Sequence, residues 1–149
     1  MNSTTLAYLA GLIDGEGYIG IKRTHRKDAM SPIYHERIQV RMVMEGSIKH
    51  LTRTLGGAYY CEKARVKNGR PLFCWQASDA LAASILTQLL PYLIIKNASA
   101  KTVLRLRRSK EDPRARRRGS PAKRTMNLSV LAYRERLYLR CKELNRVGV

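Results

Sequence analysis

Acidic residues are scarce in this sequence, which has 11 Asp and Glu against 29 Lys and Arg and a formal net charge of +18. An excess of this size is unfavourable through self-repulsion unless an anionic partner neutralises it. The first candidates for that partner are rich in phosphate: DNA, RNA or an anionic membrane surface.

Long hydrophobic runs are also missing. The stretch Leu81–Leu90 is too short to cross a bilayer and is interrupted by Ser84, Thr87 and Gln88. The N-terminus shows no basic segment followed by an apolar one, so we expect no signal peptide and no secretion. We therefore expect no membrane partner and an intracellular location where DNA is accessible, either the cytoplasm of a prokaryote or an organelle.

Cysteine is rare, and the three cysteines have no CxxC spacing. They are typical of reduced packing residues, and their spacing to the three histidines gives no support for a zinc site. The histidines are predicted to be surface or turn residues rather than a general base, because no metal-binding cluster accompanies them. These residues are Cys61, Cys74, Cys141, His25, His35 and His50.

The length of 149 residues and a hydrophobic content of 44% fit one domain spanning 1–149. The apolar periodicity predicts the order helix, hairpin, helix, hairpin, helices. This order indicates an α+β fold with helices on one face of an antiparallel sheet. We expect a helix from Ser3 or Thr4 to about Asp14, strands over 18–22 and 37–42, a helix over 46–55, strands over 58–65 and 72–77, a helix ended by Pro91, an extended segment over 92–96, a helix to about Arg108, a basic loop over 110–125, and a helix over 128–145.

Strict alternation over 37–42 predicts a strand with two different faces. One face is apolar and the other is basic, a pattern that suits packing on helices on one side and a polyanion on the other. The apolar residues are Ile38, Val40 and Met42, and the polar residues are Arg37, Gln39 and Arg41. In the second hairpin, the same alternation predicts Phe73, Trp75 and Ala77 toward the core and Cys74 and Gln76 outward.

Half of the net charge falls in one segment, because 101–124 contains eleven basic and two acidic residues, a net +9. The cluster Arg114–Arg118 with Lys123 and Arg124 either clamps flanking phosphates or forms a flexible tail with nonspecific attraction. Both alternatives predict strong salt dependence of nucleic-acid binding.

The first helix carries small residues at Ala7, Gly11 and Gly15, which share one face because they recur every four residues. Another helix backbone can approach this face closely. The sequence has only one such helix, so the simplest partner is the same helix of a second copy in a two-fold homodimer.

Glu16 is expected just beyond the end of this helix, between two glycines. In a two-fold dimer its two copies would lie close together and repel unless a cation lies between them. Carboxylate and carbonyl oxygens suit Mg²⁺, which can assist hydrolysis of a phosphodiester. The alternative is ordinary tight packing of the helix and a solvated turn residue, but that leaves the basic sheet face unexplained.

The segment Leu9–Gly17 resembles the LAGLIDADG signature in its variant ending Gly-Glu-Gly. The resemblance extends along the whole chain through the order of its elements, and one motif per chain is similar to the homodimeric homing endonucleases. It implies an αββαββα core whose sheets form a saddle over the DNA major groove. It also implies a site-specific DNA endonuclease that cuts a long, partly palindromic site across the minor groove, leaving short 3′ overhangs.

The resemblance further implies roles for single residues. Glu16 is the acidic metal ligand, the carbonyl of Gly15 helps to bind Mg²⁺, and Mn²⁺ or Ca²⁺ can substitute for binding. Lys96 falls where a basic residue usually supports the active-site water. A polar residue is usual at the end of the second strand, where this sequence has Met44 or Glu45, and only Glu45 is able to order water.

Strand positions predict the side chains that contact DNA, through base edges or phosphates. The alternative is that several of them are merely solvated. The predicted DNA contacts are Lys22, Thr24, Arg26, Arg37, Gln39, Arg41, Lys63, Arg65, Arg70 and Gln76.

The alternatives to an endonuclease are an RNA-splicing maturase, a non-cleaving DNA-binding protein of the same fold, or a ribosomal or nucleoid protein explained by charge alone.

Overall fold

The structure is a computed structural model that describes residues 1–27, 31–64, 68–115 and 127–147. Arg65 and most of the predicted basic loop lie outside the described residues. In chain order the elements are α1 (Ser3–Glu16), β1 (Gly17–Thr24), β2 (Ile33–Met42), α2 (Glu45–Leu55), β3 (Ala58–Glu62), β4 (Leu72–Ser78), α3 (Asp79–Leu89), α4 (Asn97–Glu111), a 3-10 turn η1 (Pro113–Ala115) and α5 (Leu128–Val147).

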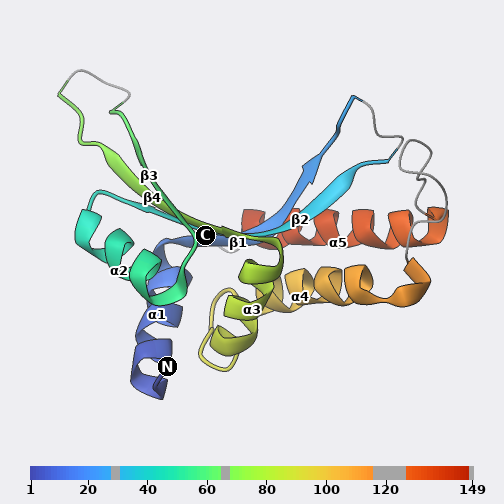
Figure 1. The fold of residues 1–149 in the computed structure, drawn as a ribbon, viewed down its shortest axis with the longest axis horizontal. Helices are drawn as coiled ribbons and strands as arrows, with labels where there is room; N and C mark the ends of the chain where they lie inside the picture. Colours follow the sequence, from blue (N-terminus) through green and yellow to red (C-terminus); the bar gives the residue numbers. More distant parts are fainter. Residues whose placement is uncertain (28–30, 65–67, 116–126, 148–149) are drawn as a thin grey trace.

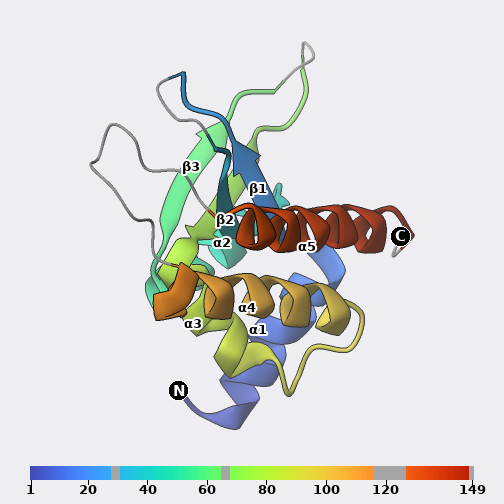
Figure 2. The ribbon, with the colours of Figure 1, turned by 90° about the vertical axis from the view of Figure 1, so that its right-hand side faces the viewer.

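The four strands form one antiparallel sheet in the order β1-β2-β4-β3. The helices gather on one side of this curved sheet and leave the other side open (Figure 1). We call the uncovered side the open face. Figure 2 shows α4 and α5 side by side beneath β1 and β2. The predicted α+β architecture with helices on one face of an antiparallel sheet is therefore confirmed.

The core lies between the sheet and the helices. The predicted inward residues Ile38 and Val40 of β2 are fully buried, as is Trp75 of β4, whose indole N–H donates to the carbonyl oxygen of Gly56 at 2.7 Å. Burial of such large apolar side chains supplies most of the favourable free energy of folding. Helices α1, α3 and α4 contribute Leu9, Ile13, Leu86, Leu89, Val103 and Leu106.

Helix α1 is longer at its C-terminal end than predicted, and its cap differs. Asn2, rather than Ser3 or Thr4, is the N-cap, because its side-chain oxygen accepts a hydrogen bond from the backbone N–H of Thr5 at 2.8 Å. The helix continues through Gly15 and ends at Glu16. Glu16 is thus the last residue of the helix and not the first residue beyond it.

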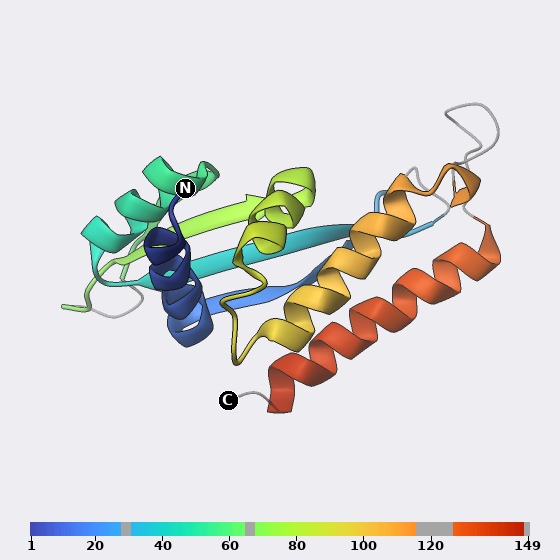
Figure 3. The same ribbon diagram turned by 90° about the horizontal axis from the view of Figure 1, so that it is seen from below.

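The C-terminal third also differs from the prediction. The predicted loop over 110–125 begins later, because α4 continues to Glu111 and Pro113 ends it. Buried Arg134 of α5 joins the two helices by donating to the hydroxyl and the carbonyl oxygen of Ser109, at 3.0 and 2.8 Å. Figure 3 shows α4 and α5 running alongside each other across the helical side of the molecule.

Candidate functional site

The end of α1 lies beside the start of α4. Glu16 and Gly15 line a hollow of about 330 Å³ together with Lys96, Ser99 and Asn145. The Glu16 carboxylate makes no hydrogen bond or ion pair with the described residues, and it is exposed. The structure therefore brings the predicted residues Gly15, Glu16 and Lys96 together around one hollow.

Asp14 fixes the turn that carries Lys96. Its buried carboxylate accepts hydrogen bonds from the backbone N–H groups of Ile94 at 2.6 Å, Ile95 at 3.2 Å and Lys96 at 2.9 Å. The Lys96 ammonium donates to the carbonyl oxygen of Asp14. The segment 92–96, which we expected to be extended, is instead a turn, because one carboxylate collects three successive N–H groups.

The C-terminal helix also reaches this hollow, which the sequence did not indicate. The side-chain amide of Asn145 donates to the carbonyl oxygen of Ile19 at 3.0 Å and to that of Cys141 at 2.8 Å. It thereby ties the end of α5 to β1, two residues after Gly17. A helix predicted only from its apolar face gives no sign of such a polar contact.

The donors around the hollow fit a divalent cation such as Mg²⁺. Glu16 offers a carboxylate without a protein partner in the described part of the chain, and Gly15 offers a carbonyl near the helix end, where carbonyls lack intrahelical partners. Among the described residues no group of three or more His, Cys, Asp or Glu side chains is placed so that it could hold a metal ion by itself. One chain thus supplies few hard ligands, and the remainder would come from water, phosphate oxygens or a second copy.

A second hollow connects Glu16 to the open face. Its volume is about 290 Å³, and it is lined by Glu16, Gly17, Tyr18, Gln39 and Arg41. Tyr18 is only partly buried, and this partial burial, with smaller effects from neighbouring groups, raises the pKa of its phenol. Tyr18 lies over Gly20, where an added Cβ would be 2.9 Å from Tyr18 Cε1. Glu16 is therefore accessible both from the Lys96 hollow and from the open face.

The open face is polar, as strand alternation predicted. The register pairs Gly20 with Arg37, Tyr18 with Gln39, and both Gln39 and Ala58 with Gln76, which places alternate residues of all four strands on this face. Of the predicted DNA contacts it carries Lys22, Thr24, Arg37, Gln39, Arg41 and Gln76, and it also carries Tyr18, His35, Tyr60, Glu62 and Ser78.

Neighbouring side chains on the open face hold one another. Arg37 donates to the side-chain oxygen of Gln76, and Gln39 donates to the Tyr60 hydroxyl at 2.7 Å. Arg41 pairs with Glu62 at 2.9 Å, and a hydrogen bond with Tyr60 raises the pKa of its guanidinium. Cys74, predicted to point outward, is buried between its strand neighbours Arg41 and Tyr60.

His35 belongs to a polar network that the sequence did not reveal. Its Nδ1 lies 3.0 Å from Asp79 Oδ1, and its Nε2 lies 3.3 Å from the Thr24 hydroxyl. Burial would raise the pKa of Asp79, but Lys110 at 3.1 Å and His35 outweigh it, so the pKa is lowered. Lys110 also binds fully buried Glu36 at 2.5 Å, on the helix-covered side.

Four of the predicted residues are placed elsewhere. Glu45 lines neither hollow at Glu16, since it opens α2 and accepts a hydrogen bond from Tyr59 at 2.7 Å, which together with Lys49 lowers the pKa of its carboxyl. Arg26 follows β1, Lys63 follows the end of β3, and Arg70 precedes β4. Side chains alternate along a strand, and Glu62 lies on the open face. Its neighbour Lys63 is therefore not placed on that face.

Among solved structures, the chain is similar to homing endonucleases. The I-CvuI enzyme in complex with the I-CreI target aligns with a TM-score of 0.71 and 23% identity over 95% of this chain and 82% of that chain. The archaeal intron-encoded I-Vdi141I, complexed with DNA, gives a TM-score of 0.73 and 12% identity over 95% and 84%. I-TnaI gives 0.59 and 12% over 97% of both chains.

No protein-family model matches the sequence, and no curated protein matches it. In the part of the chain that the structure describes, no helix has the length and apolar composition to cross a membrane. The structural likenesses show that the chain has the fold of the LAGLIDADG homing endonucleases, as the resemblance of Leu9–Gly17 implied.

Proposed function

We propose that this chain is a site-specific double-strand DNA endonuclease of the homing type, acting as a homodimer on a long, partly palindromic target. One observation carries the proposal: Glu16, a carboxylate without a protein partner in the described residues, lies where the hollow at Lys96 meets the basic open face. An acidic residue at the border of a polyanion-binding surface is unfavourable unless a cation accompanies it.

The open face would bind the DNA. A curved sheet whose side chains alternate between Arg, Gln, Lys and Tyr offers donors for base edges and for phosphates. The bonds that join Arg37 to Gln76 and Gln39 to Tyr60 fix these side chains before DNA arrives, which lowers the entropic cost of ordering them. Two of the structurally similar proteins, I-CvuI and I-Vdi141I, are themselves complexed with DNA.

Glu16 and the carbonyl of Gly15 would hold the divalent cation, which supplies Lewis acidity toward a phosphodiester and lowers the pKa of water. The I-CvuI complexes were obtained in the presence of 2 mM Mg, with the DNA not cleaved, or of 2 mM Ca. The Lys96 ammonium, held at the Asp14 carbonyl, offsets the negative charge of the scissile phosphate. Arg41 lines the second hollow together with Glu16, and it would orient the phosphate backbone of the DNA toward Glu16.

The dimer would form through α1. Ala7, Gly11 and Gly15 are exposed, and a Cβ added at Gly11 or Gly15 would have nothing within 4 Å in this chain. The packing of one chain therefore does not require these glycines, whereas close approach of a second α1 would. Exposed Tyr8 of α1 would add apolar contact area at that interface.

The decisive experiment is cleavage of a randomised-site DNA library in Mg²⁺ by the wild type, Glu16→Gln and a matched control, Glu111→Gln. Glu111 ends α4 and lines neither hollow at Glu16. We expect Glu16→Gln to cut at least about 100-fold more slowly, since it loses a metal ligand worth several kcal/mol in the transition state. Glu111→Gln should cut at the wild-type rate.

The proposal fails if the wild type cuts nothing in Mg²⁺ or Mn²⁺. Tight binding of structured RNA by such an inactive protein would point to a maturase, and binding of duplex DNA without cleavage to a non-cleaving DNA-binding protein. If Glu16→Gln cuts as fast as Glu111→Gln, the assignment of Glu16 fails while the nuclease activity stands. The expected intracellular location is tested separately, by finding whether the protein is inside the cell together with its DNA target.

A further inference from the structure

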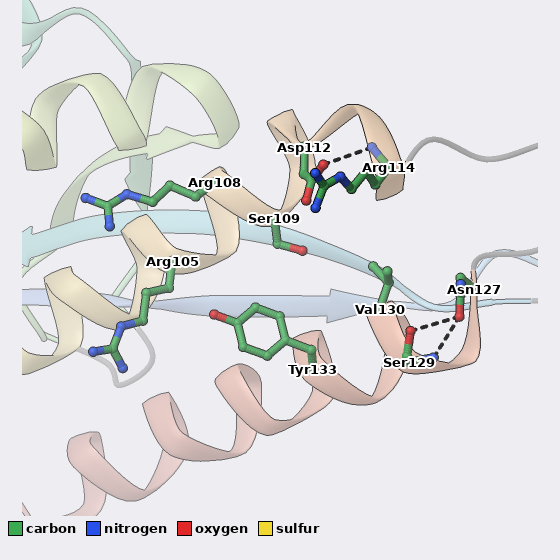
Figure 4. Close-up of a pocket in the computed structure, with 9 residues that line it drawn as sticks. All are labelled: Arg105, Arg108, Ser109, Asp112, Arg114, Asn127, Ser129, Val130 and Tyr133. Atoms are coloured by element: carbon green, nitrogen blue, oxygen red, sulfur yellow. Dashed lines mark hydrogen bonds between the residues drawn. The ribbon is translucent and has the colours of Figure 1, made fainter.

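A second basic site lies on the helical side of the molecule, away from the open face. It is a hollow of about 630 Å³ between the C-terminal half of α4, the turn η1 and the first turns of α5. Figure 4 views it from the helical side, with β1 and β2 behind the two helices. We propose that this hollow binds the phosphate backbone of a second nucleic-acid segment, separate from the DNA on the open face.

Three arginines without carboxylate partners surround the hollow: Arg105, Arg108 and Arg114. Arg105 and Arg108 lie on the side of α4 opposite its buried residues Val103 and Leu106, so they point to solvent. Among the described residues no ion pair involves any of the three. Six other cations of the described residues are paired with carboxylates, namely Arg23, Arg41, Lys49, Arg107, Lys110 and Arg140, whereas Arg53 and Lys101 are unpaired but line no hollow.

Few acidic residues lie near these arginines in the sequence. The segment 116–126, which connects η1 to α5, contains no Asp or Glu. Asp112 is the one carboxylate among the residues that line the hollow, and its Oδ1 already accepts a hydrogen bond from the Arg114 backbone N–H at 2.8 Å (Figure 4). Three guanidinium groups against one bonded carboxylate leave a net positive hollow, which favours an anionic ligand.

The remaining lining suits a nucleotide chain better than a single small anion. Neutral polar groups come from Ser109 and from Asn127 and Ser129 at the start of α5, where the Asn127 side-chain oxygen accepts from the Ser129 backbone N–H and hydroxyl. Tyr133 is 36% exposed beside them, and the Arg136 guanidinium lies over its ring at 5.9 Å from the centroid. The exposed part of the side chain presents a surface on which a base or sugar can pack. Spread-out arginines together with an aromatic ring are the features that bind successive phosphates and bases of a flexible strand.

The two helices that form the hollow are also joined by hydrogen bonds beneath it. Buried Arg134 bonds twice to Ser109, so α4 and α5 keep their spacing without a ligand. The hollow shares no residue with the two hollows at Glu16. A strand bound here therefore does not compete with cleavage for the same residues, and the inference does not rest on the proposed nuclease activity.

The test measures fluorescence anisotropy of labelled 12-nucleotide single strands, one ribo and one deoxyribo of the same sequence, over a series of salt concentrations. The variant Arg105→Gln/Arg108→Gln removes two charges from the hollow. The control Arg53→Gln/Lys101→Gln removes two exposed charges that line none of the hollows. We expect the hollow variant to bind at least about tenfold more weakly, with a salt slope shallower by about 0.7 for each lost phosphate contact.

Photocrosslinking of 4-thiouridine or 4-thiothymidine strands, mapped by mass spectrometry, supplies the location, and crosslinks to Tyr133 are expected. If Arg105→Gln/Arg108→Gln loses more affinity for the ribo strand than for the deoxyribo strand, the ligand is RNA. If it loses equal affinity for both strands, the hollow recognises the phosphate backbone alone. If both variants weaken binding equally, or crosslinks fall on the open face, the proposal is overturned. Duplex cleavage by the hollow variant should equal that of wild type, which separates this result from the test at Glu16.

Discussion

Asp14 and Lys96 are joined twice: the Lys96 backbone N–H donates to Asp14 Oδ1 at 2.9 Å, and the Lys96 ammonium donates to the Asp14 carbonyl oxygen. Asp14 lies two residues before Glu16 on the same helix. One residue thus sets the distance between the proposed metal ligand and the proposed phosphate-binding cation. The contact is a positioning device, because Asp14 itself is buried and does not line the hollow.

We predict that Asp14→Ala lowers the free energy of unfolding by about 3 kcal/mol, because three backbone N–H groups lose a charged acceptor. DNA cleavage should fall with it. Lys96→Met should reduce cleavage but change stability by less than about 1 kcal/mol, since the backbone N–H of residue 96 remains bonded to Asp14. Urea unfolding and cleavage assays on the same preparations check both. Equal stability of Asp14→Ala and wild type would refute the positioning role.

The sequence was sufficient to predict the first helix and the one side that Ala7, Gly11 and Gly15 share, because periodicity and glycine spacing are local signals. It could not indicate the role of Asp14, since its partners at 94–96 are 80 or more residues away. The same holds for Asn145, which bonds to Ile19 across 126 positions. Contacts of this kind depend on how α1, α4 and α5 pack against one another. No local pattern in a single sequence predicts them.

A second prediction concerns Gly11 and the dimer. Gly11→Leu should convert the protein to a monomer, because a large side chain blocks close approach of two α1 helices. Its effect on the stability of the isolated chain should be small or favourable, since Gly11 faces open space and glycine is a poor helix former. Sedimentation velocity and thermal unfolding measure the two effects separately.

The matched control is Gly46→Leu, because Gly46 is also a helical glycine with nothing within 4 Å of an added Cβ. We expect it to leave the oligomeric state unchanged. A wild-type protein that sediments as a monomer when bound to DNA would rule out the dimer altogether. A dimeric Gly11→Leu would show that copies meet through another surface.

A third prediction uses the pH dependence of Asp79. Its folded-state pKa lies below the ordinary 3.8, because Lys110 and His35 outweigh the effect of burial. The paired carboxylate therefore stabilises the fold above about pH 4, and this contribution disappears as the pH falls through the folded-state pKa. Asp79→Asn should destabilise the protein by less than about 1 kcal/mol at pH 7, and the difference should disappear as the pH falls through the folded-state pKa of Asp79.

Asparagine is the suitable replacement, because residue 79 has a φ of 53° and Asn tolerates this left-handed conformation. Urea unfolding at a series of pH values gives the difference curve. The control Asp112→Asn should show a much smaller difference, since among the described residues Asp112 pairs with no cation. A difference in the free energy of unfolding that stays constant from pH 7 down through the acid range would mean that the ion pairs of Asp79 do not contribute.

The open face shows a similar limit of prediction. Alternation placed Arg37, Gln39 and Gln76 correctly, because strand parity is a local property. His35 has the same parity, but the sequence predicts only a surface or turn residue at this position. Its partner Asp79 begins α3, 44 positions later. The two residues come together because β2 lies beside β4 in the sheet order β1-β2-β4-β3.

The last prediction concerns Gly20 and Tyr18. A Cβ at Gly20 would overlap the Tyr18 ring, which is the end of a movable side chain, so Gly20→Ala should displace the ring and leave stability within about 1 kcal/mol of wild type. Because Tyr18 lines both hollows at Glu16, DNA cleavage should fall. If the effect passes through the ring, Gly20→Ala should add nothing in a Tyr18→Ala background. Additive losses in this double-mutant cycle would instead mean that Gly20 itself contacts DNA.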